Sequence, residues 1–189
     1  MKKSRKAFSL VEITVGVIIA AVLLTVLMKL LTSGMKGSTK GIAHQANVEA
    51  ASILMSQIEY DLLRASEIES PELNGSDTEA KWKFYYAGSG SGTPVTVIYE
   101  ACASGGAYRK VTMDGKTQDT ILAKGHDVKL TFTHFMATPA PSKYSKLGAK
   151  YLRRHAMWVE LTVSTKHDKK VGEKETFTLK RLIVVRSHM

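Results

Sequence analysis

The first thirty residues constrain this chain more than any other stretch, because a basic leader runs directly into a long apolar segment. The apolar run extends from Phe8 to Met28, and Glu12 is its only charged residue. A run of this length approaches the roughly 20 residues needed to cross the hydrocarbon core of a bilayer. Basic flanks stay on the cytoplasmic side. The sequence therefore predicts one membrane-spanning helix, with the rest of the chain outside. The basic residues of the leader are Lys2, Lys3, Arg5 and Lys6.

The junction between leader and apolar run predicts an unusual processing site. A secretory signal has an apolar core of roughly 7 to 15 residues, followed by a small-residue cleavage site. Here the core is longer, and no A-x-A site follows it. The small residue Ala7 instead precedes the core. Cleavage between Ala7 and Phe8 would remove the charges and leave the hydrophobic helix attached. The alternative is a plain signal anchor in which Glu12 is incidental.

Glu12 carries an energetic cost within the apolar run. A charge at the centre of a membrane helix costs about 2.5 to 3.5 kcal/mol on insertion scales, and such residues are usually kept for a partner. A free amine on Phe8, created by cleavage, would be one such partner. We therefore expect Glu12 to have a function that depends on processing.

The stretch Ala7-Phe8-Ser9-Leu10-Val11-Glu12 resembles the class III signal of type IV prepilins and type II secretion pseudopilins. In that signal a basic leader ends in a small residue, followed by Phe and by Glu at the fifth mature position. The family usually has Gly where this chain has Ala7. The resemblance implies that a prepilin peptidase cuts after Ala7 and methylates the new amine of Phe8. It also implies that Glu12 pairs with this amine, in its own or an adjacent subunit, and sets the register during assembly.

A second resemblance lies further along the chain, at Asp61-Leu62-Leu63-Arg64-Ala65. This stretch is similar to the Asp-Leu-x-x-Ala motif at the end of the long helix in J-type minor pseudopilins and PilW-like minor pilins. The order of the candidate strands resembles the same group, notably at Ile98-Tyr99, Tyr108-Arg109, Thr120-Ile121-Leu122 and Val128-Lys129-Leu130-Thr131-Phe132.

These resemblances imply a non-enzymatic minor pilin or pseudopilin that initiates or caps a type II secretion pseudopilus or a type IV pilus. A minor pilin of a twitching or DNA-uptake pilus is the closest alternative. A membrane-anchored periplasmic enzyme or binding domain is the alternative from another class. The implied partners are other minor subunits, the major subunit, the prepilin peptidase and the inner membrane. The head would lie in the periplasm, and the assembled protein at the filament tip.

The long helix is predicted in two parts. Gly34, Gly37 and Gly41 each cost about 1 kcal/mol relative to Ala in a helix interior, so the helix is expected to bend or melt there. Apolar residues then recur at three- and four-residue spacings from Ala43 onward, which predicts an amphipathic helix that stops at Pro71. Together the parts would form a stem of roughly 60 residues, or about 90 Å. The predicted division is a leader over 1–7, a transmembrane and filament-core helix over 8–31, and a head over 32–189.

Beyond Lys81 the apolar period changes to two, which predicts strands. Gly105-Gly106 and Asp114-Gly115 supply hairpin turns, and such short connections imply antiparallel pairing. The predicted fold class is α+β, with one long N-terminal helix packed on an antiparallel sheet. The candidate strands cover residues 82–86, 95–103, 108–113, 127–135, 156–165 and 176–185.

Charge does not identify a partner. Removing the leader's four cations lowers the formal net charge from +10 to +6. A basic surface can face nucleic acid, anionic lipid or an acidic subunit, but no nucleic-acid motif accompanies it.

The polar stretch 69–79 contains oxygens that could bind calcium, yet the twelve-residue calcium-loop pattern is missing, so a solvated loop is favoured. Segments 87–92 and 137–150 have the composition of exposed loops suited to partner contact or solvent, and residues 187–189 fit a native end or a cloning remnant.

No catalytic group is convincing. His126 and His134 would share a strand face about 26 Å apart at 3.3 Å per residue, too far to bind one metal, so ordinary strand-end histidines are expected. Cys102, the only cysteine, cannot form an internal disulfide of the kind that many major pilins have near the C-terminus. It is expected to be a small buried residue. The sequence contains no nucleophile elbow or phosphate-binding loop, and we expect no cofactor or metal.

Overall fold

The computed structural model describes residues 9–85, 94–137, 154–165 and 175–186. Several predicted features lie outside these residues: the processing pair Ala7 and Phe8, the loop at 87–92, nearly all of the loop at 137–150, and the last three residues. The chain divides into two compact units, Met1–Ile42 and Ala43–Met189. Each is described by itself below.

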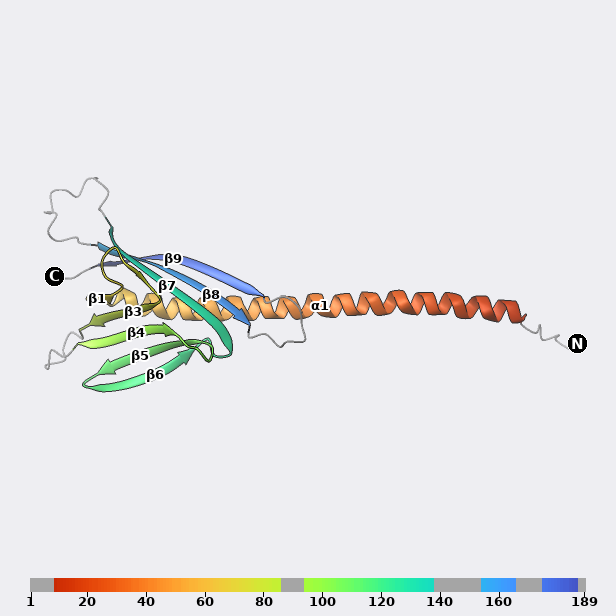
Figure 1. Ribbon diagram of the computed structural model, residues 1–189, viewed down its shortest axis with the longest axis horizontal. Helices are drawn as coiled ribbons and strands as arrows, with labels where there is room; N and C mark the ends of the chain where they lie inside the picture. The colour runs from red at the N-terminus through yellow and green to blue at the C-terminus, as the bar shows by residue number, and fades with distance from the viewer. Residues whose placement is uncertain (1–8, 86–93, 138–153, 166–174, 187–189) are drawn as a thin grey trace, which may run out of the picture. The chain divides into compact units, whose positions relative to one another are not determined.

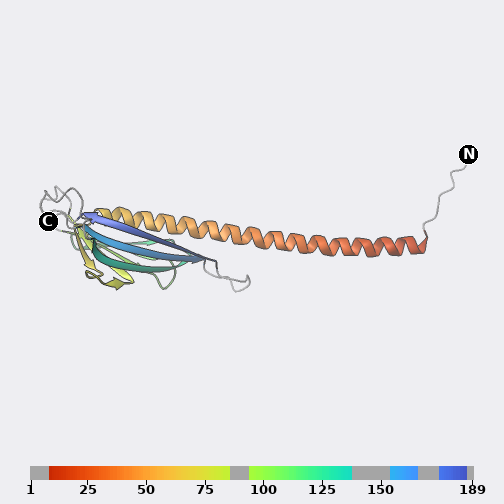
Figure 2. The same cartoon turned by 90° about the horizontal axis from the view of Figure 1, so that it is seen from above.

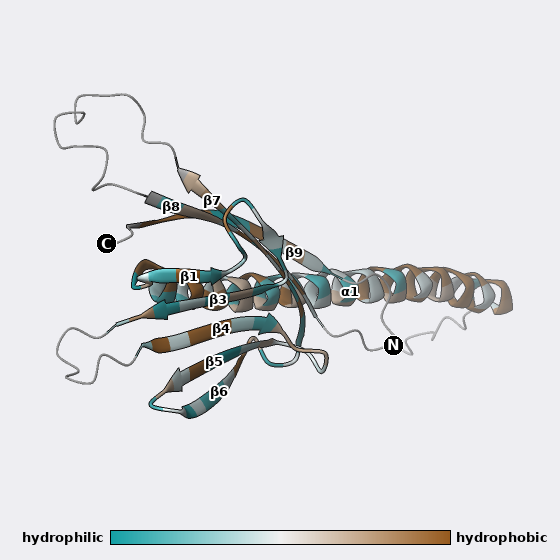
Figure 3. Ribbon diagram, turned by 60° about the vertical axis from the view of Figure 1, so that its left-hand side comes forward, coloured by the Kyte–Doolittle hydropathy of each residue, from teal (hydrophilic) through white to brown (hydrophobic). Residues whose placement is uncertain are grey.

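Helix α1 (Leu10–Leu63) is 54 residues long. In the first unit its apolar side chains are exposed, and Figure 3 shows the N-terminal turns of the helix coloured mainly as hydrophobic. It is long and apolar enough to cross a membrane, by length and composition.

The predicted melting of the helix at the glycines is wrong, since α1 is helical through Gly34, Gly37 and Gly41. Thr32 and Thr39 donate their hydroxyls to the carbonyl oxygens of Met28 and Met35 four residues earlier, at 2.7 and 2.9 Å. These hydroxyls bond back along the helix instead of capping a break. The free-energy cost of three glycines is also too small to interrupt the helix, because each residue added to a nucleated helix gains a hydrogen bond.

The helix ends at Leu63, earlier than the predicted stop at Pro71. The amide of Arg64 donates to the Asp61 carbonyl at 3.2 Å, and that of Ala65 donates to Leu62 at 3.0 Å, so the last turn tightens. The chain then enters strand β1 (Glu67–Ser70), where Ile68 pairs with Trp82. Strand pairing overrides the helical spacing of Ile68.

The strands form two antiparallel sheets rather than the single expected sheet (Figures 1 and 2). The first has the order β1-β3-β4-β5-β6, and the second β2-β7-β8-β9. In the first sheet, β1 is followed by β3 (Glu79–Phe84), β4 (Val95–Ala101), β5 (Ala107–Met113) and β6 (Lys116–Leu122). The second contains β2 (Ser76–Asp77), β7 (His126–Ala137), β8 (Arg154–Thr165) and β9 (Thr176–Arg186).

One core joins the two sheets and the second part of α1. Leu54 and Ile58 of the helix are fully buried. Trp82 on β3 stacks on Tyr99 of β4 at 5.3 Å between ring centroids and meets Phe132 of β7 edge-on at 6.5 Å. Burial of each such large apolar side chain contributes about 1.5 to 3 kcal/mol. The α+β fold class, with a long N-terminal helix on antiparallel strands, is confirmed.

All six predicted strands are present, and no end differs from the prediction by more than three residues. The turn between β5 and β6 has positive φ at Asp114 (50°) and Gly115 (74°), as a two-residue hairpin requires. Strand β6 was not among the candidate ranges, although its last residues, Thr120-Ile121-Leu122, entered the strand-order resemblance. Six of its seven residues are exposed, as suits the edge of a sheet, so it has no apolar alternation to find.

Candidate assembly site

Two regions carry residues that the sequence singled out: Glu12, expected to act in assembly, and Asp61, part of the Asp-Leu-x-x-Ala resemblance. Glu12 lies in the first turn of α1, where its amide donates to the Ser9 carbonyl at 3.0 Å. A carboxylate in this position interacts favourably with the helix dipole, by about 0.3 to 1 kcal/mol. The side chain is exposed and makes no ion pair with the residues that the structure describes. Ala7 and Phe8 lie outside those residues, so the pairing of Glu12 with the Phe8 amine stays a prediction.

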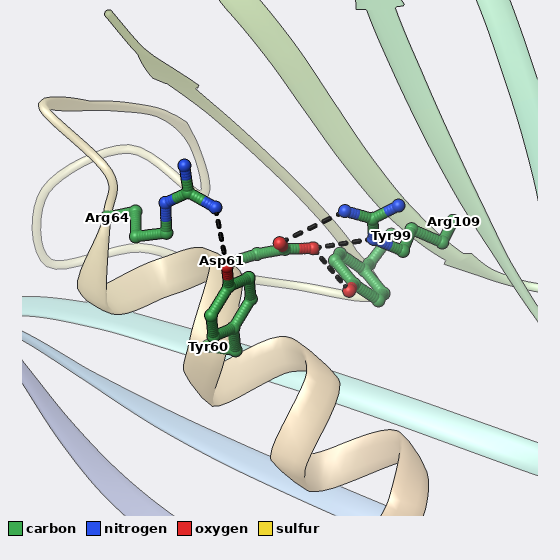
Figure 4. Close-up of polar contacts among 5 residues, drawn as sticks. All are labelled: Tyr60, Asp61, Arg64, Tyr99 and Arg109. Carbon is green, nitrogen blue, oxygen red and sulfur yellow. Dashed lines mark hydrogen bonds and ion pairs between the residues drawn. The ribbon is translucent and has the colours of Figure 1, made fainter. Parts of the chain in front are cut away.

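The second region is a buried polar cluster at the end of α1 (Figure 4). Asp61 is only 1% exposed. Its carboxylate accepts hydrogen bonds from Arg109 Nε at 2.6 Å and Arg109 Nη2 at 3.0 Å. The phenol of Tyr99 donates to the same carboxylate at 2.7 Å. Three groups from distant parts of the sequence therefore meet at one point.

Local structure explains how these groups meet. Tyr99 on β4 and Arg109 on β5 are direct partners in the antiparallel register, so their side chains project from the same face of the sheet. That face packs against α1, whose last turn carries Asp61. The Asp-Leu-x-x-Ala resemblance included Asp61 but assigned it no contact. The structure identifies it as the residue that attaches the helix end to the five-stranded sheet.

The electrostatics favour a charged pair with a neutral phenol. The hydrogen bonds to Asp61 raise the pKa of the Arg109 guanidinium. Burial, reinforced by the negative charge of Asp61, raises the pKa of the Tyr99 phenol well above its usual range. Tyr99 therefore remains a hydrogen-bond donor at every physiological pH. The two-pronged geometry between guanidinium and carboxylate is the strongest form of such a pair and also fixes its orientation.

The exposed side chain of Arg64 lies beside the buried cluster at the end of α1. Arg64 donates to the Tyr60 hydroxyl at 2.8 Å, and its guanidinium carbon lies 5.1 Å from the Tyr60 ring and 5.2 Å from the Phe84 ring (Figure 4). Cation–π contacts at such exposed sites contribute about 0.5 to 1 kcal/mol. Tyr60 and Leu63 are each 56% exposed. The end of α1 therefore combines an internal ion pair with an external apolar and cationic surface.

Polar contacts also connect α1 to the four-stranded sheet. Arg181 on β9 forms an ion pair with Glu59, and Asn47 Nδ2 donates to the Glu175 carbonyl at 3.0 Å. The helix is thus attached to both sheets, through Asp61 on one side and through Glu59 and Asn47 on the other. These contacts fix the second part of the helix on the strands.

The remaining predicted sites have structural partners. Cys102 is 8% exposed, which confirms the expectation of a buried cysteine. Glu69, placed by the sequence in a solvated loop, is on β1 and bridges Lys81 and Lys83. These ion pairs lower the pKa of Glu69. The carboxylate of Asp77 accepts from the Thr78 amide at 2.7 Å. In the part of the chain that the structure describes, no group of three or more His, Cys, Asp or Glu could hold a metal ion.

The prediction of ordinary strand-end histidines is wrong for His134. This residue is 3% exposed inside β7, with one ring nitrogen on the Pro71 carbonyl and the other on His155. His155 could not be recognised from the sequence, because the contact depends on how β7 and β8 align.

Comparison of the chain with protein-family models, curated proteins and solved structures finds no match.

Proposed function

We propose that this chain is a minor pilin or minor pseudopilin that initiates or caps a type II secretion pseudopilus or a type IV pilus. One observation carries the proposal most strongly. Helix α1 has an exposed apolar first part that begins at Leu10, shortly after the predicted processing site, and a second part held by buried contacts to an antiparallel head. Such a helix would anchor the subunit in the membrane before assembly and would pack in the core of a helical filament afterwards.

The proposed sequence of events begins in the inner membrane, with the leader cytoplasmic and the head periplasmic. A prepilin peptidase removes residues 1–7 and methylates the amine of Phe8. Glu12 then pairs with a Phe8 amine, which offsets its cost in an apolar setting and selects one axial register. The contacts of Asp61 and Glu59 support the proposal because they would make the head follow the helix as it leaves the bilayer.

The position at the tip rests on three features. A tip subunit needs helix contacts only beneath it, whereas a shaft subunit packs against copies above and below. The single cysteine leaves no disulfide-closed C-terminal loop. The Asp61 motif and strand order resemble the minor J-type group. The charge of +6 on the processed chain opposes close stacking of copies, although salt screens exposed charges beyond roughly 8 to 10 Å.

Deletion of the gene tests this function. Filament assembly should be lost or sharply reduced while the major subunit still accumulates in the membrane, and a plasmid copy should restore assembly. Purified filaments in which this chain is the main subunit along the length would contradict the tip assignment. Secretion assays alongside twitching and DNA-uptake assays on the same strain would distinguish a secretion pseudopilus from a pilus.

A further inference from the structure

The β7–β8 pair places two histidines and two methionines on one face. In the antiparallel register His134 lies opposite Met157, and Met136 lies opposite His155. Residues two apart on a strand share a face, so all four side chains project to the same side. The β-carbons of directly opposed residues are about 4.5 to 5.5 Å apart. The two imidazoles therefore lie diagonally opposite each other across the strand pair, and so do the two thioethers.

The histidine diagonal is already in contact. His134 Nε2 lies 2.9 Å from His155 Nδ1, and His134 Nδ1 lies 3.0 Å from the Pro71 carbonyl oxygen. Because a carbonyl only accepts, Nδ1 of His134 carries the proton and its Nε2 lone pair is directed at His155. A backbone carbonyl that fixes the tautomer in this way is the usual outer-shell support of a metal-binding histidine.

The site is accessible from one side. His134 and Met157 are buried, whereas His155 is half-buried and Met136 is 41% exposed. An ion could enter on the side of Met136.

We propose that this His–Met face binds copper as Cu⁺, with His134 Nε2, His155 Nδ1 and the Met136 sulfur as ligands and Met157 on the buried side. Soft thioether ligands select Cu⁺, whereas calcium, magnesium and manganese prefer oxygen ligands. Binding involves no change of oxidation state.

The geometry requires only a small adjustment. Metal–imidazole bonds are about 2.0 to 2.1 Å, so two nitrogens on one ion lie roughly 3.3 to 3.6 Å apart at tetrahedral to trigonal angles. The present 2.9 Å separation must widen by about half an ångström. His155 can supply this movement because it is half-buried. Its proton transfers from Nδ1 to Nε2 through water, which frees the Nδ1 lone pair for the ion.

Competition titration with a chromogenic Cu⁺ chelator tests the site, using the full chain in detergent under anaerobic conditions. We expect tight binding of one Cu⁺ per chain. His155→Gln and Met136→Leu should each weaken binding at least tenfold. His126→Gln is the matched control, because His126 is on the same strand at its opposite end, and it should leave the affinity unchanged.

Two further measurements make the test decisive. Without metal, His155→Gln and Met136→Leu should have the melting temperature of the unsubstituted chain. Added Cu⁺ should raise the melting temperature of the unsubstituted chain and of His126→Gln by more than that of these two variants. A Zn²⁺ titration should be unaffected by Met136→Leu, since zinc does not need the thioether. Unchanged Cu⁺ affinity in His155→Gln would overturn the proposal, as would an affinity that falls equally in His126→Gln.

Discussion

The carboxylate of Asp61 on α1 accepts two hydrogen bonds from the guanidinium of Arg109 on β5, at 2.6 and 3.0 Å, in a site where Asp61 is 1% exposed. A buried pair of this kind contributes little net energy when intact, because desolvation offsets the attraction. Breaking it is costly. Its main effect is therefore to fix the position of the helix end on the five-stranded sheet.

Substitution of Arg109 tests this relationship. Arg109→Met leaves the Asp61 charge buried without its cation and should lower the free energy of unfolding by about 3 to 5 kcal/mol, measured by urea denaturation. The double substitution Asp61→Leu with Arg109→Met removes both charges and should recover part of this loss, because the buried Tyr99 hydroxyl still lacks its acceptor. Lys110→Met is the control: its pair with Glu100 is one-third exposed, so its loss should cost under about 1 kcal/mol. Equal losses at positions 109 and 110 would contradict a special role for Asp61.

The Tyr99 hydroxyl should contribute separately. Tyr99→Phe keeps the stacking on Trp82 and removes only the donor to Asp61. Loss of a hydrogen bond to a charged group should cost about 1.5 to 3 kcal/mol in unfolding free energy. Tyr60→Phe removes an exposed hydroxyl bonded to Arg64 and should cost much less. A Tyr99→Phe protein as stable as the parent would show that the phenol is dispensable.

Stability should depend on pH through His134. Burial lowers the pKa of His134 in the folded chain below the value of about 6.5 expected when unfolded. Below that pH the unfolded chain binds a proton that the folded chain does not, so stability is complete above about pH 7.5 and falls as the pH drops through 6.5 toward the folded pKa. Melting temperatures between pH 8 and pH 5 should show this decline in metal-free protein. His134→Asn should flatten it, and an equally steep decline in that variant would assign it to other groups.

Glu12 should matter for assembly and not for membrane insertion. Glu12→Ala removes a charge that costs about 2.5 to 3.5 kcal/mol in a membrane, so insertion should be unchanged or improved. Incorporation into filaments should fall, as measured by immunoblot of sheared filaments. Glu72→Ala, at an exposed position beyond β1, should incorporate normally. Normal incorporation of Glu12→Ala, together with unchanged crosslinking to partner subunits, would remove the proposed role.

The parts of the fold with strong local patterns were predictable from the sequence. The alternation of Val159, Leu161 and Val163 with polar or exposed residues indicates a strand with one buried face. All three side chains are fully buried on that face. The glycines near residue 37 were misleading because local propensity is weak relative to the continuity of a long helix. Strand β6 was missed because an exposed edge strand needs no apolar residues.

The candidate sites were only partly predictable, since their contacts depend on register. Asp61 was recognised by a motif, but its contacts with Tyr99 and Arg109 follow from the alignment of β4 with β5. The contact between His134 and His155 likewise depends on the register of β7 with β8. A sequence shows which residues share a strand face but not which strand lies beside them.

The most direct test of the account is the mass of the mature N-terminus. Protein extracted from membranes of a host with an active prepilin peptidase should yield a chain that begins at Phe8 and carries one additional methyl group on its amine. The same chain from a host without the peptidase should retain Met1–Ala7 and serves as the control. A mature chain that still begins at Met1 in the presence of the peptidase, or that is cut beyond Met28, would contradict the assignment to the pilin-like proteins.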